Sequence, residues 1–126
     1  MSRSAVIAAI EDAKRKPFKP GTHDCALFVA AVVKAKTGRD YARGWRSKYR
    51  SLKAGQALLQ EAGFDDHIAI VAAHFEEIPP ALARFGDIAV VEDALGIVNG
   101  GTVFVLRPDG LGTVDLLSAS RAFRVR

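Results

Sequence analysis

A histidine, an aspartate and the only cysteine of the chain are adjacent in the stretch KPGTHDCALFVAAVVKAKTG, residues 19 to 38. A cysteine thiol becomes a strong nucleophile when it ionises, a histidine can take up its proton, and a carboxylate can orient that histidine. His23, Asp24 and Cys25 are therefore the candidate catalytic residues. The alternative for Cys25 is a small, inert residue of the core.

The sequence after Cys25 bears on its reactivity. Every residue from Cys25 to Val33 is apolar, which predicts a fully covered helix that begins near Asp24 or Cys25 and ends at Gly38. The first turn of a helix lowers a thiol pKa through the helix dipole and unpaired N–H groups. We therefore expect Cys25, if solvent reaches it, to alkylate faster than a free cysteine near neutral pH. For His23, the alternative to a base is a helix-entry residue that hydrogen-bonds the loop.

The remaining polar candidates have structural interpretations. His67 and His74 lie on a predicted helix and are expected to decorate its surface. Asp87 follows Gly86 at the start of a predicted strand, where a carboxylate typically accepts hydrogen bonds from the N–H groups of a turn. No second ligand cluster with zinc spacing accompanies residues 23 to 25, so we expect no metal and no cofactor.

The elements that must position these residues change type once along the chain. Up to residue 75 the pattern predicts helices, with Gly and Pro as breaks between them. These helices are Ala5 to Lys14 capped by Ser4, Cys25 to about Lys36, Leu52 to Ala62 stopped by Gly63, and a helix from a cap at Asp65 to about Phe75.

Beyond Pro79 and Pro80, short β-branched runs separated by turn residues predict an antiparallel meander, with strands at residues 87–91, 95–98, 103–106 and 113–117. Helices followed by strands indicate an α+β fold in which the helix from Cys25 packs centrally on the sheet. The length of 126 residues suits a single domain, residues 1–126.

Composition excludes several classes of protein. A single cysteine cannot form an intrachain disulfide, and the apolar run of residues 5 to 10 is too short for a signal peptide or a membrane span. We expect synthesis in the cytosol and no membrane contact.

Basic residues concentrate between residues 34 and 53, and the net charge is +4. We interpret them as a solvated face rather than a nucleic-acid site, because no nucleic-acid motif accompanies them.

A resemblance to a known family rests on HDCALFVAAVVKAKTG, FGDIAVV and LGIVNGGTVFVL. Together these segments resemble the NlpC-type cell-wall peptidases of the papain-like superfamily. The resemblance implies a papain-like fold, with Cys25 as the nucleophile, Asp24 as the acid before it and Gly86-Asp87 as the strand entry. HDCALF, TGRD, RSKYRS, PPALARFGD and LSASRAFRV more closely resemble small proteins of phages and prophages of Alphaproteobacteria, often encoded among tail genes. This second resemblance covers nearly the whole chain.

The chain departs from the NlpC pattern at two catalytic positions. The family histidine stands two residues before the glycine of the second strand, and here Ala94 holds that place, with Leu95 next to it. The third polar residue would fall within residues 103 to 106, which are all apolar. We expect Ala94 or Leu95 near Cys25 and no histidine on the facing strand, so that the proton shuttle of a cysteine hydrolase is missing.

Three function classes follow. We favour a catalytically degenerate pseudoenzyme that is made in the bacterial cytoplasm and becomes a virion component, a structural or assembly part of a phage or prophage tail with other tail proteins as partners. The second class is an active hydrolase that uses Cys25 on peptidoglycan, as an endopeptidase or amidase. The third is a basic module that binds nucleic acid, with salt-sensitive affinity.

Overall fold

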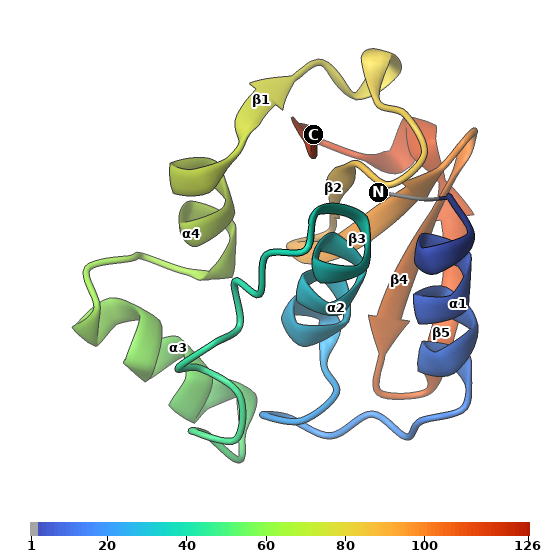
Figure 1. The fold of residues 1–126 in the computed structure, drawn as a ribbon. Coiled ribbons are helices and arrows are strands. Elements are labelled where there is room, and N and C mark those ends of the chain that lie inside the picture. Colours follow the sequence, from blue (N-terminus) through green and yellow to red (C-terminus); the bar gives the residue numbers. More distant parts are fainter. Residues whose placement is uncertain (1–2) are drawn as a thin grey trace.

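The computed structural model describes residues 3–126, in which four α-helices accompany one antiparallel sheet of six strands (Figure 1). The helices are α1 (Arg3–Lys14), α2 (Cys25–Thr37), α3 (Leu52–Glu61) and α4 (His67–His74). The strands are β1 (Glu76–Ile78), β2 (Ile88–Val91), β3 (Ala94–Asn99), β4 (Thr102–Arg107), β5 (Gly110–Asp115) and β6 (Arg121–Arg124), with short 3-10 turns η1 (Pro80–Leu82) and η2 (Leu116–Ser118). The predicted α+β class is confirmed.

Helix α2 is the central helix. Its N-cap is Asp24, whose carboxylate accepts a hydrogen bond from the backbone N–H of Leu27 at 3.0 Å. Its C-cap is Gly38, which adopts the left-handed φ of 84° that glycine favours. The helix packs on α1 and on strands β3 and β4, as the apolar run predicted. Its buried side chains are Leu27, Phe28, Val29, Val32 and Val33.

The sheet has the strand order β1-β6-β2-β3-β4-β5, and every neighbouring pair is antiparallel. The meander predicted from residue 87 onward corresponds to β2 through β5 and is confirmed. Strands β1 and β6 were not predicted. The arginines at the ends of β6 suggest a basic surface, yet Ala122 and Phe123 between them are fully buried. Strand β6 therefore lies inside the sheet, between β1 and β2.

Both faces of the central strands are covered. One face carries Ile88, Leu95 and Ile97 and packs against the cluster that includes α1 and α2. The other face carries a second cluster of five buried residues, which the segments around η1 and η2 help to cover: Ala89, Val91, Val98, Val103 and Val105. Residues of both clusters are almost fully buried, which makes this sheet a rigid support for the start of α2.

Several predicted boundaries shift. Helix α1 begins at Arg3, so Ser4 lies inside it and is not its cap. The cap of α4 is Asp66 rather than Asp65, because the Asp66 carboxylate accepts hydrogen bonds from two backbone N–H groups of the first turn. The turn before β3 contains only Glu92 and Asp93, since Ala94 already pairs with Val91.

Helices α3 and α4 lie on the side of α2 that is away from α1 (Figure 1). They bury little of their own surface. Gly55 is the buried residue of α3, and Ile68 and Val71 are those of α4. Gly55 lies under the ring of Tyr49, where a Cβ atom would come within 3.0 Å of two ring carbons. In the described chain, no helix has the length and apolar character that a membrane crossing requires.

Candidate functional site

Cys25 is the first residue of α2, is half-buried, and lines a cavity of about 660 Å³. Residues of α2, α3, α4 and the β2–β3 turn all contribute to the walls of this cavity. The cavity therefore lies between the central helix and the two outer helices, and the thiol faces it from the start of α2.

The environment of the sulfur raises the pKa of the Cys25 thiol above its usual value. Burial is the largest cause, and the negative charge of Asp24 acts in the same direction. Backbone N–H groups of Leu95, Ala26 and Cys25 itself oppose this shift. The expectation of a lowered pKa is wrong, because the loss of solvation disfavours the thiolate more than the helix N-terminus stabilises it.

Leucine side chains occupy the strands next to Cys25. Leu95 of β3 belongs to the cluster that packs against α2, whereas Ala94 packs toward the second cluster. The backbone N–H of Leu95 is also close enough to the Cys25 thiol to act against the rise of its pKa, and Ala94 and Leu95 line the same cavity as Cys25, so the prediction that Ala94 or Leu95 lies near Cys25 is confirmed. Leu106 of β4 lines the same cavity. The strands of the described chain carry no histidine here, as their sequence requires.

The Asp24 carboxylate is bound by three donors. In addition to the N–H of Leu27, it accepts hydrogen bonds from the N–H of Gly21 at 3.0 Å and from the hydroxyl of Tyr49 at 2.5 Å. Burial and the bond to Asp24 raise the pKa of Tyr49 strongly. Asp24 therefore caps α2 and anchors Tyr49, and within residues 3–126 none of its hydrogen bonds comes from an imidazole. Sequence reasoning missed Tyr49, which no local pattern connects with Asp24.

His23 is directed toward α1. Its side chain is buried, with 8% exposure, and its Nε2 atom lies 3.1 Å from the carbonyl oxygen of Ala13 in the last turns of that helix. A short bridge between Lys19 and His23 closes the loop before α2. His23 thus enters α2 with its backbone bonded to the loop, whereas its side chain bonds helix α1 and not the loop.

His67 lies differently from the sequence-based expectation. It is half-buried, lines the cavity that contains Cys25, and has Nε2 2.5 Å from the carbonyl oxygen of Asp93. The expectation of a surface decoration is wrong for His67, because α4 covers the cavity with its first turn beside the β2–β3 turn. His74 is exposed, bonds the carbonyl of Ile70 and meets the ring of Tyr41 edge-on. Among the described contacts, neither ring has a hydrogen bond to the Cys25 sulfur.

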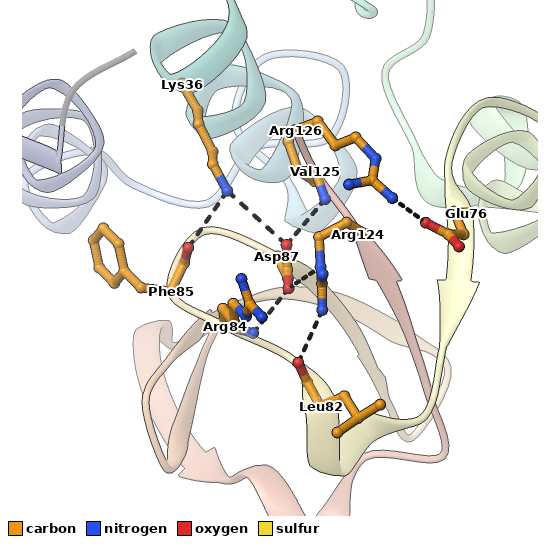
Figure 2. A network of polar contacts seen from close by, with 9 residues as sticks. All are labelled: Lys36, Glu76, Leu82, Arg84, Phe85, Asp87, Arg124, Val125 and Arg126. Carbon is orange, nitrogen blue, oxygen red and sulfur yellow. Dashed lines mark hydrogen bonds and ion pairs between the residues drawn. The ribbon is translucent and has the colours of Figure 1, made fainter.

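Asp87, which is fully buried, is the centre of a separate network of polar contacts (Figure 2). Its carboxylate accepts hydrogen bonds from the N–H groups of Arg84 at 2.8 Å and Val125 at 2.9 Å. The Arg124 side chain donates to it at 3.1 Å, and the Lys36 ammonium lies 3.9 Å away. The turn role predicted for Asp87 is confirmed, and the network ties α2, the start of β2 and β6 together.

The described residues contain no group of three or more His, Cys, Asp or Glu side chains that could hold a metal ion. Within the basic segment of residues 34 to 53, Arg46 forms a two-pronged pair with Asp40, and Lys36 is directed to Asp87. That the other basic residues of this segment form a solvated face stays a prediction.

The sequence matches the family model DUF6950, described as a domain of unknown function, over residues 2–125. The chain belongs to the DUF6950 family. No curated protein matches the sequence. Since the description of DUF6950 names no activity, the chemistry of this DUF6950 domain must be argued from Cys25 and its surroundings.

Proposed function

We propose that this DUF6950 chain is a catalytically degenerate relative of the NlpC-type peptidases and a structural or assembly component of a phage or prophage tail. Its main support is the pair Leu95 and Leu106 on the strands beside Cys25, where a hydrolase needs a base and a group that orients it. Leucine can neither accept the thiol proton nor return a proton to a leaving group.

The state of the thiol agrees with this proposal. A raised pKa keeps Cys25 protonated near neutral pH, and a protonated thiol is a weak nucleophile. His23 is bound to the end of α1, and the Asp24 carboxylate is occupied by its three donors. The two other candidate catalytic residues are therefore engaged in holding the start of α2.

The hydrolytic part of the proposal is tested with purified protein and peptidoglycan. Wild type and Cys25→Ala are incubated with sacculi and with a synthetic stem peptide, and released fragments are measured by mass spectrometry. We expect no fragment above the level of the buffer in either sample. Fragments that appear with wild type and disappear with Cys25→Ala would show an active hydrolase and contradict the proposal.

The tail role is supported by the resemblance of nearly the whole chain to small proteins encoded among phage tail genes. Its test is the location of the protein. Particles purified after prophage induction are analysed by mass spectrometry, and the protein is mapped by labelled antibody in electron micrographs. We expect it at the tail. Its absence from particles that contain every other tail protein would exclude a virion component.

A second candidate function is a hydrolase in which His67 supplies the base from α4. The observation in its favour is that His67 and Cys25 line one cavity and that the Asp93 carbonyl orients the His67 ring. Donation of the Nε2 proton to that carbonyl leaves Nδ1 as the acceptor. If any Cys25-dependent turnover is found, His67→Ala should abolish it. His74 lines the same cavity, but its ring is exposed and is held by the Ile70 carbonyl and Tyr41, so His74→Ala should retain turnover.

A further inference from the structure

Three helices direct apolar side chains into the same cavity. On α2 the cavity residues Ala26, Val29, Ala30 and Val33 follow the spacing of one helix face. On α3 the cavity is lined by Leu52 and Leu59, and on α4 by Ile70 and Val71. A helix normally buries such an apolar face against other side chains, but here the faces surround open space.

The size of this space is unusual for the interior side of a small domain. Protein interiors are close-packed, and voids larger than a water molecule are few. At about 660 Å³, the cavity lies within the range of small-molecule sites, roughly 300–1,000 Å³. Its aromatic lining includes Phe18, Trp45, Phe64 and Phe75. A space of this volume with such walls is suited to an apolar ligand.

An extended peptide fits the cavity poorly. Strands β2 and β3, which reach its wall, both lie inside the sheet, so their backbone groups are already paired with neighbouring strands. A peptide in contact with apolar helix faces would leave its own N–H and C=O groups without partners. A hydrocarbon chain has no such groups. A hydrocarbon chain can also lie along the wall that α2 provides, because the helix from Ala26 to Val33 extends roughly 10 Å at the rise of an α-helix.

We propose that the cavity between α2 and the α3–α4 pair binds a single-chain amphiphile, with the acyl chain along the small side chains of α2. Because the cavity is partly open, the polar head of the ligand stays in contact with water. Helices α3 and α4 form the cover, and their sparse packing against the rest of the molecule allows them to separate for entry. This binding is independent of whether Cys25 has any hydrolytic activity.

The test is titration calorimetry with dodecanoate, kept below its micellar concentration, on wild type and two matched variants. Ala30→Trp places an indole in the cavity, because Ala30 is half-buried and lines it. Ala31→Trp introduces the same side chain one residue further along α2, where Ala31 is exposed. We expect wild type and Ala31→Trp to bind alike and Ala30→Trp to bind at least about tenfold more weakly, since the indole fills the site.

Chain length provides a second measurement that needs no variant. Decanoate should bind wild type about tenfold more weakly than dodecanoate, because two fewer methylene groups leave water. Dodecanol should bind comparably to dodecanoate if the chain carries the affinity. The proposal is overturned if dodecanoate does not bind wild type, if affinity does not rise with chain length, or if Ala30→Trp, shown folded by its melting curve, binds as wild type does.

Discussion

Cys25 lies at the start of helix α2 and beside the strands that carry Leu95 and Leu106. Two effects of opposite sign therefore act on the pKa of its thiol. The N–H groups of the helix start and of Leu95 stabilise the thiolate, whereas burial and Asp24 stabilise the thiol. The second pair of effects prevails. A cysteine at a helix N-terminus is therefore reactive only if solvent also reaches it.

The first prediction concerns the alkylation of Cys25. Because its pKa is raised, the thiolate fraction at pH 7 is smaller than that of a free cysteine, and iodoacetamide should label it more slowly. The labelling rate should rise with pH and reach its midpoint above the usual thiol pKa. The control is the same protein in concentrated urea, which should label like a free cysteine. Labelling of the folded protein that is faster at pH 7 than in urea would contradict the raised pKa.

The second prediction concerns Asp87. Asp87→Asn retains the shape of the side chain but removes the charge that faces Arg124, whose side chain is only 17% exposed, and it removes one acceptor. We expect the free energy of unfolding to fall by about 2–4 kcal/mol, because a partly buried cation and two backbone N–H groups then lose their charged partner. Urea unfolding followed by circular dichroism measures this change.

Glu77→Gln is the matched control for Asp87→Asn, since it also neutralises a carboxylate paired with an arginine. Glu77 and Arg121 are both exposed, with side-chain exposures of 49% and 41%. Their pair should contribute little to stability. If the two substitutions lower the free energy of unfolding equally, the network around Asp87 contributes no more to stability than an exposed ion pair.

Among the elements, the β2–β3 hairpin has an unusual turn. Glu92 and Asp93 adopt positive φ angles of 49° and 66°, in the left-handed region that favours Gly, Asn and Asp and disfavours residues such as Glu. The turn lines the cavity, and its Asp93 carbonyl holds His67. Backbone strain of this kind is often kept where a turn serves a site.

The third prediction follows from this turn. Replacing Glu92-Asp93 by Asn-Gly should raise the free energy of unfolding by about 1 kcal/mol, because these residues suit a two-residue hairpin turn of this type. Thermal and urea unfolding would measure the gain. Asp109→Gly in the β4–β5 turn is the control, since Asp109 does not have a positive φ and should gain nothing. A loss of stability in the Asn-Gly variant would show that the native side chains hold the turn.

Local pattern predicted some elements and missed others for a physical reason. The apolar run of α2 has no polar face, so the helix must be covered by other elements on all sides. The β-branched runs of β2 to β5 are close enough in sequence to pair as hairpins. Strand β6 pairs with β2, which lies 31 to 35 residues earlier in the chain. The arginines at the ends of β6 also mask its two buried residues in the sequence. Such long-range pairing leaves no local signal.

The same distinction holds for the candidate site. The position of Cys25 at the start of α2 could be predicted from the helix start, and the position of Ala94 or Leu95 near it was implied by the resemblance to the NlpC-type peptidases. The bond from Tyr49 to Asp24 and the position of His67 at the cavity could not be predicted. The Tyr49–Asp24 bond and the place of His67 both depend on the path of the chain after α2. No local sequence pattern predicts that path.

At the scale of the whole molecule, the two outer helices are attached less firmly than the core. Tyr49 links the start of α3 to Asp24, and His67 links α4 to the β2–β3 turn. Between these two contacts lies the cavity rather than packed side chains. The α3–α4 pair therefore has less buried support than the helices α1 and α2.

The fourth prediction is a difference in local stability. Backbone amides of α3 and α4 should exchange with deuterium much faster than those of α2 and β3, because local opening of α3–α4 exposes little apolar surface. Hydrogen exchange followed by mass spectrometry measures this difference. Protection of α3 equal to that of α2 would show that the outer helices open only when the whole domain unfolds.

The place of β6 in the sheet has a consequence for the synthesis of the chain. Strand β2 cannot gain its second neighbour, and the Asp87 carboxylate cannot meet Arg124 and Val125, until these residues have left the ribosome. Until then, one edge of the β2–β5 meander is open and can pair with other chains. A nascent chain halted before residue 121 should therefore need a chaperone, whereas one extended past residue 126 can close its own sheet.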